Sequence, residues 1–275
     1  MVPAQENYSR AFDHVEEAFD RLDTALWGPV SQETVALSDP RPGEHVLDAC
    51  CGNGASALPA ARRVGPTGTV WGVDTSERQI RAARDRCSAE GLGWARFTVA
   101  DATALPPRPF GYDLVQCVLG IFFFPEMTTG TEHLLAQARP GGRVALTIWQ
   151  KGAMETVARH LIAAVEPIAP AVAEAAATRA ERAEIYRIDT PPVFTRWLEE
   201  RGLEEVVVTT CPYSVQLTDD LAWDLVIGSG FRALLADLGD RQVEQVRKDY
   251  LERLHAHGVG RVDATTLVGM GRTRQ

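Results

Sequence analysis

Residues 45–61 read HVLDACCGNGASALPAA, and this stretch decides the fold class. The apolar run His45–Ala49 predicts a buried strand that leads into a turn carrying Gly52 and Gly54, and the Ala-rich sequence that follows predicts a helix. Glycines permit positive φ and let a ligand approach the backbone closely, and a helix amino terminus favours negative charge. The stretch therefore predicts a strand–turn–helix unit that binds a small ligand at its turn.

Further apolar runs alternate with helical patterns along the chain, which predicts a parallel α/β sheet. These runs are Thr69–Val73, Arg96–Val99, Leu114–Leu119 and Arg143–Trp149. Ser76, followed three residues later by Gln79, forms a capping box, and Gly91 provides a helix stop. The PGG at Pro140–Gly142 should break the chain before the fifth strand, ending a helix around Glu132–Arg139.

The second half of the chain adds the last elements. Lys151–Arg201 is helical in pattern and Ala-rich, and it reads as an insertion after the fifth strand. Glu204–Thr210 and Ala264–Met270 predict two more strands, with helices around Asp219–Leu238 and Arg241–Ala256 between them. We therefore expect a doubly wound, mostly parallel sheet of seven strands with an antiparallel edge strand.

Composition sets limits on the class of protein. The chain has 275 residues, of which 45% are hydrophobic and 24% charged, which suits one large globular domain and excludes disorder. The five cysteines are scattered and lack a C-x-x-C spacing, so we expect no zinc or other metal site and a cytoplasmic location. The start, MVPAQENYSR, lacks the features of a secretory signal, and no stretch approaches the ~20 apolar residues of a membrane span.

The net charge of the chain indicates which class of substrate it can bind. The 28 basic residues are outnumbered by 37 acidic ones, giving a net charge of −9. Because affinity for nucleic acid comes mostly from neutralising phosphates, this balance argues against a nucleic-acid substrate.

The glycine turn alone leaves two cofactor classes open. Gly52–Ala57 also fits the dinucleotide pattern G-x-G-x-x-A, and Asp74 at the end of the next strand is placed to bind ribose hydroxyls in either class. Asp48 discriminates between them, because a carboxylate at the turn would repel a pyrophosphate. The same carboxylate suits the ammonium group at the amino-acid end of S-adenosylmethionine.

VLDACCGNG resembles the first motif of class I S-adenosylmethionine-dependent methyltransferases, an acid followed by G-x-G-x-G, with Cys50 where the first glycine is expected. The resemblance implies a Rossmann-like methyltransferase fold. It also implies that Asp74 in VWGVDTS binds the ribose and that Asp101 in FTVADATALP, beside Ala102, accepts a hydrogen bond from the adenine amino group.

The resemblance extends to the fourth strand, YDLVQCVLGIFFF, whose end carries Cys117 and usually lies along the cofactor. The residues predicted to bind the cofactor are Tyr8, Asp48, Cys50, Gly52, Gly54, Asp74, Thr75, Gln79, Asp101, Ala102 and Cys117. Tyr8 is included because tyrosines in the amino-terminal lid of similar enzymes reach the cofactor carboxylate. On this basis we divide the chain into a helical lid (1–40), an S-adenosylmethionine-binding core (41–150), a helical substrate cap (151–203) and the rest of the core sheet with its helices (204–275).

Motifs that the sequence lacks exclude several subclasses of methyltransferase. The fourth strand is followed by VLGIFFFPE rather than the Asn/Asp-Pro-Pro-Tyr of amino-methylating DNA and glutamine enzymes, and there is no Pro-Cys nucleophile for pyrimidine methylation. What remains is similar to the ubiquinone/menaquinone-biosynthesis-like branch of small-molecule methyltransferases, which includes many natural-product tailoring enzymes.

Acceptor and catalytic residues are predicted from position. Phe122 follows the fourth strand and Trp149 ends the fifth, and together they suggest an apolar acceptor, with Tyr186 as a further contact or base. His14 in the lid and His160 in the insertion are candidate general bases.

The sequence therefore predicts methyl transfer by in-line displacement to a hydrophobic small molecule, in natural-product biosynthesis. Two alternatives stay open, a nicotinamide-dependent oxidoreductase and a non-catalytic S-adenosylmethionine-binding protein. The acceptor atom is also open, and the Ala-rich insertion at Ala163–Ala177 suits either a pocket cap or a homodimer face.

Overall fold

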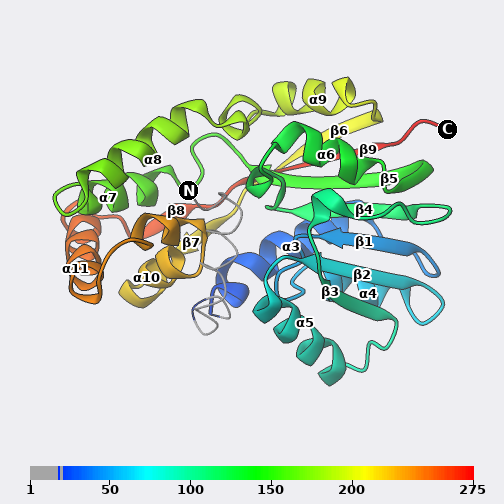
Figure 1. The fold of residues 1–275 in the computed structure, drawn as a ribbon, viewed down its shortest axis with the longest axis horizontal. Helices are drawn as coiled ribbons and strands as arrows, with labels where there is room; N and C mark the ends of the chain where they lie inside the picture. Colours follow the sequence, from blue (N-terminus) through cyan, green and yellow to red (C-terminus); the bar gives the residue numbers. More distant parts are fainter. Residues whose placement is uncertain (1–17, 19–20) are drawn as a thin grey trace.

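The computed structural model describes Ala18 and residues 21–275, and its centre is a seven-stranded sheet of order β3-β2-β1-β4-β5-β9-β6 (Figure 1). The strands are β1 His45–Ala49, β2 Thr69–Asp74, β3 Ala95–Val99, β4 Tyr112–Val118, β5 Ala138–Trp149, β6 Glu204–Cys211 and β9 Thr266–Arg272. Each strand predicted from an apolar run is confirmed, with ends that differ by a few residues.

One antiparallel strand is present, as predicted, but it does not form the edge. β9 pairs antiparallel with both β5 and β6, so β6 is the edge strand. The side chains explain the order. β9 is buried along most of its length, and its Gly269 leaves space that Phe194 and Leu198 fill, whereas β6 exposes residues such as Val207.

The expected break at Pro140–Gly142 is instead a bend inside β5. The strand already begins at Ala138, and its register against β4 shifts between Tyr112 and Leu114. Gly141 has φ of 67°, a conformation that glycine adopts without steric cost. The helix before it, α6 (Met127–Leu135), ends earlier than predicted.

Helices cover both faces of the sheet. Side chains alternate along each strand, so Val46 and Leu114 belong to the core under α3 (Gly28–Ser38), α4 (Ala57–Val64) and α5 (Glu77–Ala89). Leu47 and Val115 point to the opposite face, where α6 and α9 (Pro191–Glu200) cover them. The doubly wound fold predicted from the sequence is confirmed.

A separate helical layer, which we call the cap layer, gathers at one side of the sheet (Figure 1). Its elements are η1 (Asp23–Trp27), α7 (Glu155–Val165), α8 (Pro170–Arg182), α10 (Asp219–Ile227), η5 (Gly230–Leu235), α11 (Asp240–Ala256) and a two-stranded sheet of β7 (Ser214–Gln216) and β8 (Arg261–Asp263). These elements share a hydrophobic core of their own, around Leu161, Leu225 and Tyr250. The small sheet was not predicted from the sequence. The packing of residues 214–263 against helices of the insertion was also not predicted.

None of the helices in the described part of the chain is long and apolar enough to cross a membrane.

Candidate functional site

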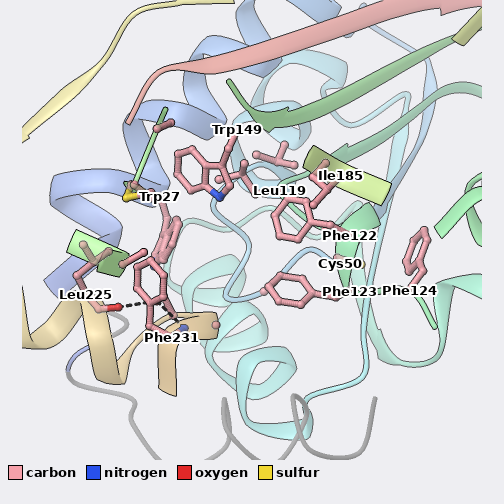
Figure 2. A pocket seen from close by; sticks show the side chains of 18 of the residues that line it. Trp27, Cys50, Leu119, Phe122, Phe123, Phe124, Trp149, Ile185, Leu225 and Phe231 are labelled. Atoms are coloured by element: carbon pink, nitrogen blue, oxygen red, sulfur yellow. Dashed lines mark hydrogen bonds between the residues drawn. The ribbon is translucent and has the colours of Figure 1, made fainter. Parts of the chain in front are cut away.

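A cavity of about 1050 Å³ lies where the carboxyl ends of the central strands meet the cap layer. One end is lined by the turn after β1 and by the ends of β2 and β3, and we call it the polar end. The other is lined by aromatic side chains from the cap layer and from the ends of β4 and β5, and we call it the aromatic end (Figure 2). Ligands of open α/β sheets bind at this edge.

The turn after β1 is held by hydrogen bonds to β2. The Gly52 N–H donates to Asp74 Oδ2 at 3.0 Å, and the Cys51 N–H donates to the Val73 carbonyl at 3.0 Å. Cys50, Gly52 and Gly54 all have positive φ. Cys50 therefore adopts the left-handed conformation that suits the glycine expected there, and it lines the cavity, where its contact with a cofactor stays a prediction.

Asp48 is not on the cavity wall. Its side chain is fully buried, and Oδ2 accepts a hydrogen bond of 2.7 Å from the Ser56 hydroxyl. Burial raises the pKa of the Asp48 carboxyl from 3.8 to about 7, against the opposing effect of Ser56 and Gln116. The prediction of direct contact with an ammonium group is therefore wrong. Alternation along β1 points Asp48 to the face of Val46, towards α4, where it supports the turn from beneath.

Asp74 closes β2 at the cavity wall, as predicted. Its Oδ1 accepts from the Ser76 N–H at 2.9 Å while Oδ2 accepts from Gly52. Thr75 and Gln79 line the cavity beside it, and the Gln79 N–H donates to the Ser76 hydroxyl, as expected for the predicted cap. One carboxylate thus orients the turn and faces the cavity.

Asp101 follows β3, also on the cavity wall, with Ala102 beside it. Its Oδ1 accepts from the Thr103 N–H at 2.8 Å and from the Thr103 hydroxyl at 2.7 Å, which fixes the side chain. Two carboxylates therefore stand at the ends of neighbouring strands, as the sequence predicts.

Cys117 is fully buried within β4 and is not on the cavity wall, so its predicted contact with a ligand is wrong. It shares a face of β4 with Val115, under α6. Val118, Leu119 and Gly120 line the cavity instead. The pKa of the Cys50 thiol is raised, chiefly by its hydrogen bond with Cys117 and by burial, so Cys50 stays a neutral thiol.

The aromatic end is assembled from distant segments. Trp27, Phe122, Phe123, Trp149 and Phe231 point towards a common space (Figure 2). Phe122, Trp149 and Tyr186, which were predicted to contact an acceptor, all line the cavity, and Tyr186 is 58% exposed. Their contact with an acceptor stays a prediction. Sequence reasoning missed Trp27, Phe123 and Phe231 as lining residues. No local pattern identifies Trp27 or Phe231, because their neighbours here are far away in the sequence.

Two of the predicted catalytic residues can be placed. His160 packs its ring 4.7 Å from that of His257 on the side of α7 away from the cavity, so it lies outside the site. The helical period explains this, because Arg159 and Ile162 line the cavity while His160 shares the opposite face with Val157. Tyr186 lines the cavity. Tyr8 and His14 lie outside the described residues.

The polar groups that line the polar end fit S-adenosylmethionine better than a dinucleotide. Asp74 and Asp101 offer carboxylate oxygens for ribose hydroxyls and an adenine amino group. The Gly52 N–H donates to Asp74 and is therefore not available to a pyrophosphate, and no described Lys or Arg lines this end to offset a pyrophosphate's negative charge. The described residues also contain no group of His, Cys, Asp and Glu that could hold a metal ion.

Comparison with known proteins agrees with this geometry. Residues 46–142 match a family described as a methyltransferase domain. The chain is 36% identical to nocamycin O-methyltransferase of Saccharothrix syringae over 50% of its length and 49% of that protein. It is 35% identical to aklanonic acid methyltransferase DauC of Streptomyces sp. strain C5, over 50% of this chain and 63% of that one.

The chain thus spans about half to three-fifths of the length of these curated relatives. Among solved structures, the YcgJ protein of Bacillus subtilis matches with a TM-score of 0.59 at 14% identity, covering 89% of this chain and 98% of that one. That likeness shows the fold.

Proposed function

From the match of residues 46–142 to a methyltransferase domain, we propose that the protein is a class I, S-adenosylmethionine-dependent enzyme that methylates a hydrophobic small molecule. The observation that carries the proposal is one continuous cavity in which the carboxylates of Asp74 and Asp101 face an aromatic chamber. S-adenosylmethionine supplies an activated methyl group when bound. The residues at the polar end would hold it, and the aromatic end would exclude water and orient the acceptor by in-line approach.

The setting we propose is natural-product biosynthesis. Two relatives are named as nocamycin O-methyltransferase and aklanonic acid methyltransferase. The cavity volume of about 1050 Å³ leaves room beside a cofactor for an acceptor of several rings. An oxygen acceptor follows from the name of the first relative and is part of the proposal.

The remaining expectations extend the proposal. We propose a cytoplasmic location, supported by the five free cysteines. We also propose a small-molecule substrate rather than a nucleic acid, supported by the net charge of −9. The division into lid (1–40), core (41–150), cap (151–203) and remaining core (204–275) stays a proposal, as does a homodimer.

Neither alternative class is favoured by the site. A nicotinamide-dependent oxidoreductase would bind a pyrophosphate at the turn, where the Gly52 N–H is already taken by Asp74 and no described Lys or Arg offsets the negative charge. A non-catalytic binding protein would have no need of an aromatic chamber continuous with the cofactor end.

Mass spectrometry tests the proposal. The protein is incubated with methyl-labelled S-adenosylmethionine and a panel of polycyclic hydroxyl compounds, with bulk tRNA and casein as parallel acceptors. We expect labelled methyl ethers in the panel and no label in the macromolecules. Label only in tRNA or casein, or none anywhere, would contradict the proposed substrate class.

A further inference from the structure

Asp189 is a carboxylate on the cavity wall. The sequence predicts His14 and His160, and not Asp189, as candidate general bases. It lies between η4 (Glu184–Arg187) and α9, and its backbone carbonyl accepts a 2.8 Å hydrogen bond from the Lys151 N–H. Lys151 is two residues beyond Trp149, the last residue of β5. This bond therefore holds Asp189 beside the strand end where the aromatic chamber begins.

The Asp189 side chain is not engaged by the rest of the described structure. Among the described carboxylates that line the cavity, Asp74 and Asp101 accept backbone N–H groups, and Glu155 and Glu166 are exposed. Asp189 is half-buried, and its side chain makes no hydrogen bond or ion pair with another described residue. A partly desolvated carboxylate without such a partner is a candidate functional group.

The electrostatic surroundings support a role in proton transfer. Burial raises the pKa of the Asp189 carboxyl, and the charge of Lys151 offsets part of that effect. A raised pKa makes a carboxylate a stronger base. Lys151 and Arg159 also line the cavity, and these cations disfavour an acceptor that carries an ammonium group.

We propose that Asp189 binds the hydroxyl of an aromatic acceptor and acts as its general base. This inference rests on the proposed function and deepens it, because it specifies an aromatic hydroxyl as the substrate class. In the reaction the acceptor oxygen forms a bond to the methyl carbon. The carbon–sulfur bond breaks, its electron pair stays on sulfur, and the hydroxyl proton passes to Asp189 and then to solvent.

A structural role for Asp189 makes a different prediction. The residue stands next to Thr190, the amino-terminal cap of α9, where an acidic side chain interacts favourably with the helix dipole. That role would change stability on substitution but would not distinguish a hydroxyl from a methoxy group in the cavity.

The test is a calorimetric titration of the full chain, first with S-adenosylhomocysteine and then, on the loaded protein, with 2-naphthol and 2-methoxynaphthalene. We expect the wild type to bind 2-naphthol about tenfold more tightly than the ether, because only the hydroxyl donates to a carboxylate. The ratio should fall to about one in Asp189→Ala and to about threefold in Asp189→Asn, which keeps the shape of the side chain.

Asp237→Ala is the matched control, since Asp237 is exposed and outside the cavity lining, and it should keep the tenfold ratio. Formation of 2-methoxynaphthalene from S-adenosylmethionine and 2-naphthol should fall about 100-fold in Asp189→Ala, with S-adenosylhomocysteine affinity unchanged.

The inference is overturned if the wild type binds both naphthalenes equally, or neither. It is also overturned if Asp189→Ala keeps the tenfold ratio, or if 1-naphthylmethylamine is bound and methylated in preference to 2-naphthol. Failure of the wild type to bind S-adenosylhomocysteine, which is read before any naphthalene is added, would overturn the proposed function and this inference with it.

Discussion

The two ends of the cavity are built in different ways. The polar end comes from the turn after β1 and from the ends of β2 and β3, within residues 50–102, and its carboxylates are fixed by backbone N–H groups. The aromatic end collects Trp27, Trp149 and Phe231 from segments far apart in the chain. Hydrogen bonds between and within the loops at neighbouring strand ends define the polar end, whereas packing between distant elements defines the aromatic end. Substitutions at the two ends should therefore have separable effects.

The largest effect is expected for Asp74→Ala. The change removes the acceptor of the Gly52 and Ser76 N–H groups, so the turn loses its support and the ribose loses its partner. We expect affinity for S-adenosylhomocysteine to fall about 100-fold by calorimetry, since hydrogen bonds to charged groups are lost. Binding of 2-naphthol should change less than threefold. Asp85→Ala, an exposed position on α5, serves as the control, and an equal loss there would contradict the account.

Asp48→Asn should affect binding less and show a characteristic pH dependence. The folded-state pKa of Asp48 is raised from 3.8 to about 7, so the folded state favours the protonated form. Its stabilising contribution is complete below about pH 3.8 and is lost as pH rises through about 7. The Asn side chain carries no charge at any pH, so the Asp48→Asn variant does not lose stability as pH rises. We therefore expect the variant without ligand to melt about 5 °C higher than wild type at pH 8.

The same substitution should weaken S-adenosylmethionine binding about tenfold at pH 8, because a buried negative charge near the turn stabilises a cationic ligand. Calorimetry and thermal melting at pH 5 and pH 8 provide both readouts. Unchanged affinity together with NAD binding would favour the oxidoreductase alternative.

Trp149→Ala tests the aromatic end. Removing the indole from the chamber should lower affinity for 2-naphthol about fivefold, while S-adenosylhomocysteine affinity stays within twofold. Trp223→Ala removes a tryptophan of the cap layer that does not line the cavity, and it should leave both affinities unchanged. A loss of cofactor affinity in Trp149→Ala alone would show that the two ends are not separable.

The smallest effect is expected for Tyr250→Phe in the core of the cap layer. The Tyr250 hydroxyl is buried and has no hydrogen-bond partner among the described residues, so its removal should leave the melting temperature unchanged or slightly higher. A drop corresponding to more than about 1 kcal/mol would mean that this core depends on polar contacts, as the polar end does.

The strands and the two wall carboxylates could be predicted because the signals are local. An apolar run marks a buried parallel strand, and an acid at its end must lie at the carboxyl edge, which holds for Asp74 and Asp101. Asp48 and Cys117 were misplaced because they sit inside strands. There the alternation of side chains points them under helices rather than towards the ligand edge.

Only the residues of the aromatic end that stand at or just after strand ends, Phe122 and Trp149, could be predicted, because the other contacts there depend on tertiary packing. Arg21 pairs with Asp224, 203 positions along the chain, and no local pattern encodes that proximity. For the same reason Trp27 and Phe231 gave no signal, although the helices that carry or flank them were expected.

The measurement that tests the central claim most directly is calorimetric titration of the protein with S-adenosylhomocysteine, with NAD in parallel. We predict micromolar binding of S-adenosylhomocysteine and no heat from NAD, because Asp74 and Asp101 suit a nucleoside while the Gly52 N–H is engaged by Asp74 and no described Lys or Arg offsets the charge of a pyrophosphate at this end. Binding of NAD without binding of S-adenosylhomocysteine would contradict the assignment of the cavity.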